Sequence, residues 1–137
     1  RIIARSPRHG LRPAPGRIAR WSIPSGPNVR VDSHCEVGCV VPPYYDPLLA
    51  KIIVWAPDRA AAIRRMRRAL EETVVEGAGI DTNIALHKAV LVHPDFREGA
   101  VSTQWLDDYL KSPEWGQRML DEEANGIPRA DPASRQH

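Results

Sequence analysis

Three side chains that can bind a metal ion or take part in nucleophilic catalysis stand within six residues of one another. His34 and Cys35 are adjacent, and Cys39 follows. A zinc site needs a fourth ligand, and the other four histidines stand at no metal-site spacing from this group. Neighbouring residues of a strand point to opposite faces, so His34 cannot serve as the base for Cys35. We therefore interpret the cysteines as a structural pair of small buried residues and expect no metal site.

A second chemically suggestive group follows a few residues later. Pro42 and Pro43 fix an extended backbone, and Tyr44, Tyr45 and Asp46 come next. A stiff turn loses little entropy on folding, so it can hold two phenols and a carboxylate at the head of a strand. The same pattern also suits a packing corner, and residue chemistry alone leaves both interpretations open.

Arginine is concentrated at positions 1–20, which hold six arginines and no acid, and again at positions 64–68, which hold four. The first group is typical of a solvated extended segment, and the alternative is that one or more of its members face an anionic ligand. Glutamates at 71, 72 and 76 and a formal net charge of only +2 favour a solvated helix face over a nucleic-acid surface. We expect no nucleic-acid partner.

The composition indicates a globular chain that could bury its own core. It has 137 residues, of which 42% are hydrophobic and 26% charged, and no apolar run is long enough to cross a membrane. Two cysteines do not make the disulfide framework of a small secreted domain, and no signal peptide is recognisable, so we expect a cytoplasmic protein without a membrane partner. The first methionine is Met66, so we expect a piece of a longer protein.

Hydrophobic patterning predicts the elements of the first half. Alternating apolar residues indicate two antiparallel strands within residues 16–32, joined by a turn at 24–28. An apolar, β-branched run at 48–55 indicates a buried strand. Asp58 is a good N-cap for a helix that ends near Gly77, and a short strand is plausible at 73–75.

The second half is predicted to be helical. Thr82 or Asp81 can cap a helix that ends before Pro94, and a third helix is expected at 103–110. The buried side of that third helix should consist of Trp105, Leu106 and Tyr109. The fold class is α+β, a small antiparallel sheet packed with helices. We expect one domain at 1–111 and a polar tail at 112–137, with one loose helix around 115–124.

Several motifs strongly resemble the C-terminal domain of biotin carboxylase. The resemblance rests on Val29-Arg30-Val31-Asp32-Ser33-His34, Gly38, Val41-Pro42-Pro43-Tyr44-Tyr45-Asp46, Leu48 and Lys51, with Pro15-Gly16-Arg17-Ile18 and Trp21 before them and Asp58-Arg59, Glu76-Gly77, Thr82-Asn83 and Pro94-Asp95-Phe96 after them. It covers most of residues 1–110. It implies the fold of that domain and the C-terminal part of an enzyme found in acetyl-CoA, propionyl-CoA and pyruvate carboxylases.

The resemblance also implies chemistry and partners. The family is a ligase that uses ATP and Mg²⁺ to activate bicarbonate and carboxylates biotin on a carrier protein. The implied partners are the biotin carboxyl carrier protein or domain, the carboxyltransferase and a second copy of the parent enzyme, with acetyl-CoA carboxylase of fatty acid biosynthesis as the expected setting. The ATP-grasp part of the family lies before Arg1, so we expect this chain to be inactive alone and to bind no cofactor by itself. The alternative is a non-catalytic assembly module of a carboxylase complex.

Four residues receive roles from the resemblance. Arg1 matches the catalytic arginine that stabilises negative charge on the ureido oxygen of biotin. Tyr45 and Asp46 match the substrate pocket, where Asp46 orients the arginine. Arg30 matches a residue of the homodimer contact.

Two departures from the family pattern stand out. Where the family continues with Glu-Asp-Pro, this chain has Arg5-Ser6-Pro7, which reverses the charge at the edge of the implied pocket. Gly79-Ile80-Asp81 lengthens the turn before Thr82.

Overall fold

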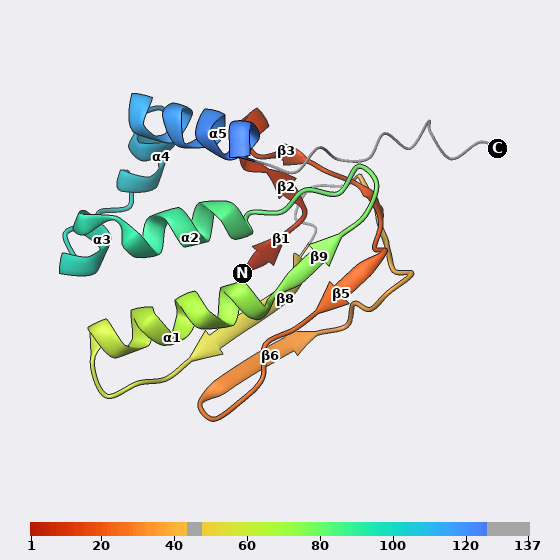
Figure 1. The fold of residues 1–137 in the computed structure, drawn as a ribbon, viewed down its shortest axis with the longest axis horizontal. Coiled ribbons are helices and arrows are strands. Elements are labelled where there is room, and N and C mark those ends of the chain that lie inside the picture. The colour runs from red at the N-terminus through yellow and green to blue at the C-terminus, as the bar shows by residue number, and fades with distance from the viewer. Residues whose placement is uncertain (44–47, 126–137) are drawn as a thin grey trace. The chain divides into compact units, whose positions relative to one another are not determined.

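The computed structural model describes residues 1–43 and 48–125 (Figure 1). The chain forms two compact units, Arg1–Ala100 and Val101–His137, and each is described by itself. The first unit contains β1 (Ile2–Ile3), β2 (Arg5–Ser6), the 3-10 turn η1 (Pro7–His9), β3 (Arg12–Pro13), β4 (Gly16–Arg17), β5 (Arg20–Ser22), β6 (Val29–Ser33), β7 (Val40–Val41), β8 (Leu48–Val54), α1 (Arg59–Glu72), β9 (Val74–Glu76), α2 (Ile84–Val92) and α3 (Pro94–Glu98). This combination confirms the α+β class.

A three-stranded antiparallel sheet is the centre of the first unit. β8 is its middle strand, with β1 on one side and β6 on the other. Leu49 and Ala50 of β8 are buried, which confirms the buried strand predicted at 48–55. Ile2, Ile18 and Leu70 are the largest fully buried side chains, and they join β1, the segment after β4 and α1 in one core.

The predicted pairing of two strands within 16–32 is wrong. Both strands form, but β5 pairs with β9, so that Trp21 lies opposite Val75, and β6 pairs with β8. Alternation identifies a strand without identifying its partner.

Local signals set the limits of α1. The Asp58 carboxylate accepts a hydrogen bond from the amide of Ala61 at 2.8 Å, so the predicted N-cap is confirmed. The helix ends at Glu72, before the predicted end near Gly77, and the β-branched residues that follow form β9. Arg64, Arg67 and Arg68 are exposed, as expected of a solvated face.

Two glycines allow the turn at 77–79 to touch β4. A Cβ atom on Gly77 would lie 2.0 Å from the carbonyl oxygen of Arg17, and one on Gly16 would lie 2.4 Å from that of Ala78. The backbone of Gly16 and Arg17 is itself held by the pairing of β4 with β7. Only glycine permits this approach.

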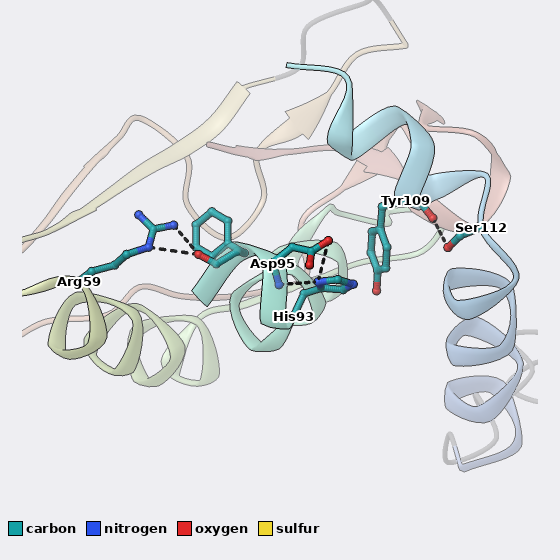
Figure 2. A network of polar contacts seen from close by, with 6 residues as sticks. Arg59, His93, Asp95, Tyr109 and Ser112 are labelled. Carbon is teal, nitrogen blue, oxygen red and sulfur yellow. Dashed lines mark hydrogen bonds and ion pairs between the residues drawn. The ribbon is translucent and has the colours of Figure 1, made fainter. Parts of the chain in front are cut away.

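α2 and α3 differ in part from the expectation. The N-cap position of α2 is Asn83 rather than Thr82 or Asp81, and the helix ends before Pro94 as predicted. α3 is too short to give a periodic pattern, so the sequence did not reveal it. It begins at Pro94, and Nδ1 of His93 accepts a hydrogen bond from the Asp95 amide at 3.1 Å (Figure 2).

The second unit contains α4 (Trp105–Leu110) and α5 (Pro113–Asn125). Tyr109 is buried and stacks on Trp105 at 5.1 Å between ring centroids, whereas Leu106 is 38% exposed, so its predicted burial is wrong. The Ser112 hydroxyl donates to the carbonyl of Tyr109 at 2.6 Å (Figure 2) and accepts from the Trp115 amide, which joins the two helices. The domain boundary at 111 stays a prediction.

Membrane-spanning helices are absent from residues 1–43 and 48–125. No helix there combines the length and the apolar character needed to cross a bilayer.

Candidate functional site

The outer edge of β1 is bonded by Asn83, at the N-terminus of α2. Asn83 is 7% exposed, and its backbone amide donates to the carbonyl of Ile3 at 3.3 Å. Its Oδ1 accepts from the Ile3 amide, and its Nδ2 donates to the carbonyl of Arg1, both at 3.0 Å. The side chain of Asn83 therefore takes the place of a neighbouring strand and fixes the backbone that carries Arg1.

His87 adds a second contact to the same carbonyl group. Its Nε2 lies 2.8 Å from the carbonyl oxygen of Arg1 and 2.9 Å from Nδ2 of Asn83. A carbonyl oxygen only accepts, so the bonded ring nitrogen carries the proton. Burial lowers the pKa of His87, although the hydrogen bond to Arg1 opposes that shift. The neutral ring that results can hold the strand without adding positive charge beside Arg1.

The Arg1 residue itself is exposed and stands beside a small cavity. The cavity has a volume of about 200 Å³. Its lining is mostly apolar and comes from β1, β8, α1, α2 and α3: Arg1, Ile2, Ile52, Met66, Leu70, His87, Val90, Leu91 and Phe96. A guanidinium beside an apolar hollow is chemically suited to an anionic or partly anionic group attached to an apolar body.

Tyr45 and Asp46, the predicted pocket residues, lie outside the described residues. The strands on either side are placed: Val41 in β7 pairs with Gly16, and Leu48 in β8 pairs with Ile3. The roles of Tyr45 and Asp46 therefore stay predictions, and so does the catalytic role of Arg1.

The two departures from the family pattern contact each other. The hydroxyl of Ser6, which is 6% exposed, donates to Oδ2 of Asp81 at 2.8 Å. The guanidinium of Arg5 donates to the carbonyl of Leu11 at 3.0 Å. The altered strand β2 thus contacts the lengthened turn. The buried hydroxyl of Ser6 has a hydrogen-bond partner there, although the residue types in β2 differ from those of the family.

Arg30 lies on an exposed face of the sheet. Its guanidinium makes a two-point ion pair with Asp32, at 3.0 and 3.1 Å. Ile53, which pairs with Arg30 in the sheet register, is 48% exposed. The dimer role of Arg30 remains a prediction.

Cys35 and Cys39 carry free thiols with their sulfur atoms 3.7 Å apart. Both side chains are partly buried and pack against the core, whereas His34 is exposed. Within the described ranges no cluster of three or more His, Cys, Asp or Glu side chains could hold a metal ion.

The described residues fit the nucleotide and Mg²⁺ of the family poorly. The turn at 77–79 is filled by its contact with β4, since a Cβ on Gly77 would meet the Arg17 carbonyl, and so it leaves no space for a phosphate. No cluster in the described part of the chain has the carboxylates that Mg²⁺ prefers.

Asn83 and His87 are the functional candidates that sequence reasoning missed. Asn83 is part of Thr82-Asn83, which resembles the family pattern. No pattern in the sequence shows that its side chain bonds to a strand 80 residues away. His87 lies four residues further along α2, on the face that meets β1. That spacing is the one available signal.

Comparison with protein families matches this chain to one domain. The model of the biotin carboxylase C-terminal domain matches residues 1–108. Biotin carboxylase from Nostoc sp. is 48% identical over 111 residues, which are 81% of this chain and 24% of the relative. The chloroplastic biotin carboxylase of Arabidopsis thaliana is 49% identical over 106 residues, which are 77% of this chain and 19% of the relative.

Solved structures agree with the sequence comparison. The biotin carboxylase domain of a thermophilic 2-oxoglutarate carboxylase, bound to bicarbonate, superposes with a TM-score of 0.75 and 39% identity. The match covers 80% of this chain and 24% of that one. Biotin carboxylase from Campylobacter jejuni gives a TM-score of 0.73 at 38% identity, over 79% of this chain and 24% of that one. The chain spans about a quarter of the length of these proteins.

Proposed function

The chain belongs to the family of biotin carboxylase C-terminal domains, and we propose that it supplies one wall of the biotin pocket in the ATP-dependent carboxylation of carrier-bound biotin with bicarbonate. The observation that carries this proposal is the clamp on β1. Asn83 and His87 both bond to the carbonyl of Arg1, so the residue implied to act on biotin starts from a fixed backbone. A catalytic group must be positioned before it can stabilise a transition state.

The Arg1 guanidinium is the proposed catalytic group. When the ureido nitrogen of biotin loses its proton, negative charge develops on the ureido oxygen. A guanidinium is permanently cationic and offers donors in a fixed plane, so it stabilises that oxygen more in the transition state than in the ground state. The apolar cavity beside Arg1 supports this role because it can receive an apolar part of the substrate next to the guanidinium.

Tyr45 and Asp46 are the proposed partners of Arg1. A carboxylate within reach of the guanidinium would hold it in one orientation, and a phenol can donate a hydrogen bond to a polar group of biotin. If Asp46 acts through Arg1, then removing both costs no more activity than removing Arg1 alone.

Catalysis requires an ATP-grasp domain, which we propose binds ATP, Mg²⁺ and bicarbonate. The chain spans about a quarter of its relatives, and its described residues include no cluster of His, Cys, Asp or Glu side chains for the metal. We propose that the chain alone is inactive and that activity appears only with that domain. The biotin carboxyl carrier protein presents the biotin, and the carboxyltransferase takes the carboxyl group onward.

We propose acetyl-CoA carboxylase of fatty acid biosynthesis, in the cytoplasm, as the parent complex. Identities of 42–49% to proteins named biotin carboxylase, against 40% to a pyruvate carboxylase subunit and a 2-oxoglutarate carboxylase subunit, support this choice. A solved 2-oxoglutarate carboxylase domain is named as a dimer. We propose a dimer here too, with Arg30 and Ile53 at the contact.

A chimera tests the proposal. Residues 1–111 of this chain replace the matching segment of the Nostoc biotin carboxylase, and biotin-dependent release of ADP is measured in the presence of bicarbonate. The chimera should be active, and Arg1→Met should lower kcat by about 100-fold or more. Arg12→Met removes a second exposed arginine and should leave kcat unchanged.

The alternative is a non-catalytic assembly module. It predicts a chimera that folds and binds the carrier protein but releases no ADP above background. Equal activities for Arg1→Met and Arg12→Met would likewise contradict the proposed role of Arg1.

A further inference from the structure

The loop that joins β6 to β7 brings the only two cysteines of the chain into contact. Their sulfur atoms are 3.7 Å apart, within hydrogen-bond distance for two thiols, and neither is bonded to a partner covalently. A disulfide bond is about 2.05 Å long, so the two sulfurs need to approach by less than the length of one bond. A side-chain rotation at either residue supplies a movement of that size.

The backbone of this loop is fixed at both cysteines. The Cys35 amide donates to Oγ of Ser33 at 3.1 Å, and the Cys39 amide donates to the carbonyl of Glu36 at 3.1 Å, which closes a tight turn. The Cys39 carbonyl accepts from the Ile18 amide at 2.9 Å. The thiols are therefore held together by the fold and do not meet by chance motion of a free loop.

The surroundings of the pair allow small reagents to reach it. Both cysteines are only partly buried, and the neighbouring Val37 and Val40 are 62% and 58% exposed. Burial, followed by the hydrogen bond with Cys39, raises the pKa of Cys35 to about 11. At neutral pH Cys35 is consequently mostly a protonated thiol, so it exchanges slowly with disulfides.

We propose that Cys35 and Cys39 form a modification site, an intrachain disulfide that is made and broken reversibly by exchange with a low-molecular-weight disulfide such as glutathione disulfide. The thiolate of one cysteine attacks a sulfur of glutathione disulfide and releases one glutathione. The second cysteine then attacks the protein sulfur of the mixed disulfide and releases the other. Two protein thiols are oxidised, one glutathione disulfide is reduced to two glutathione thiols, and the protons end on those thiols.

The disulfide should stabilise the fold, since the two sulfurs already meet in it. Closing this five-residue loop removes entropy from the unfolded chain at little cost to the native geometry. By thermodynamic linkage, the folded chain must then form the disulfide more readily than the unfolded chain does. This inference is independent of the proposed carboxylase role, because it rests on the loop alone.

The test is a redox titration of the full chain in glutathione buffers. After quenching with N-ethylmaleimide, intact mass spectrometry should show two alkylated thiols in reducing buffer and none in oxidising buffer, with a monomer on non-reducing gels. Dithiothreitol should restore both thiols. The ratio of squared glutathione concentration to glutathione disulfide concentration at half oxidation should be at least 10-fold higher for the folded chain than for the chain unfolded by urea. The oxidised protein should melt at a temperature about 5 °C higher than the reduced protein.

Three results would overturn the inference. Both thiols could stay free in oxidising buffer, or the products could be chains that carry one glutathione on each cysteine or disulfide-linked dimers. The third result is that the urea-unfolded chain oxidises as readily as the folded one. Cys35→Ser and Cys39→Ser are the matched controls. Each should stop at a single mixed disulfide with glutathione, and circular dichroism before oxidation confirms that each variant is folded.

Discussion

The two edges of the three-stranded sheet are finished in different ways. On one side, β1 has only two residues, and Asn83 bonds to its outer edge through both backbone and side chain. On the other side, β6 has five residues, and its outer edge is paired with no strand of the described chain. The short edge is closed by the chain itself, and the long edge is left available.

The difference corresponds to the proposed roles of the two edges. An edge that presents a catalytic residue gains from rigidity, because small displacements reduce catalysis. An open edge is a place where another chain can attach, and charged side chains restrict which chain does so. Arg30 and Asp32 form such a charged pair on β6.

Removing the clamp on β1 should have the largest effect. Asn83→Ala leaves the amide of Ile3 and one bond of the Arg1 carbonyl unsatisfied, so the free energy of unfolding should fall by about 2–3 kcal/mol. Chemical denaturation measures the loss. The chimera carrying this change should lose kcat as well, since Arg1 is no longer held.

Gln117→Ala is the matched control for the clamp. It also removes a hydrogen-bonded amide, the one that donates to Asp121 at 2.9 Å, but that amide is exposed on α5. Its cost should be about 0.2–0.5 kcal/mol. Equal costs for the two variants would show that Asn83 is an ordinary surface amide and that the β1 edge is not closed by it.

The contrast between the edges also marks what the sequence could predict. Local signals sufficed for α1, where Asp58 caps the helix three residues from its bonding partner. The pairing of β5 and β6 was mispredicted because the choice of partner depends on strands far away. The role of Asn83 was missed because a side chain there replaces a strand, and no periodic pattern encodes that.

The candidate site was predictable to the extent that it followed a family motif. The motif named Arg1, Arg30, Tyr45 and Asp46, but it did not supply the contacts that hold Arg1. Those contacts join residues more than 80 positions apart, and only the folded chain brings them together. The contact between Ser6 and Asp81 was hidden for the same reason, although each residue alone was recognised as unusual.

The exposed face of the sheet that carries Arg30 can be tested by placing a charge on it. In the chimera, Ile53→Asp should raise the dissociation constant of the dimer by about 10-fold or more, because an unpaired carboxylate would be buried at the contact. Sedimentation velocity measures the change. Val101→Asp alters another exposed apolar residue of the chimera, after α3, and should leave the dimer intact. A dimer unaffected by Ile53→Asp would place the contact elsewhere.

The clamp should also respond to pH through His87. Its pKa is lowered in the folded chain, mainly by burial, so below about pH 6.5 the unfolded chain takes up a proton that the folded chain resists. The stabilising contribution is therefore complete above pH 6.5 and is lost as the pH falls toward the lowered pKa. Between pH 7.5 and 5.5 the free energy of unfolding should drop by about 1 kcal/mol.

His87→Gln separates this effect from other titrations. Glutamine keeps an N–H donor for the Arg1 carbonyl but does not titrate. The variant should be nearly flat over the same pH range in denaturation experiments. A variant as pH-sensitive as the original chain would assign the dependence to other groups.

Breaking the ion pair on β6 should have the smallest effect on stability. The side chains of Arg30 and Asp32 are 72% and 46% exposed, so water already solvates both charges. Arg30→Ala should change the free energy of unfolding by less than about 0.5 kcal/mol. The same variant should weaken the dimer of the chimera if the pair selects the partner chain. A small change in the free energy of unfolding together with a large change in the dissociation constant of the dimer would separate the two edges by function. A large loss of stability would instead mean that the β6 edge is as much a part of the fold as the β1 edge.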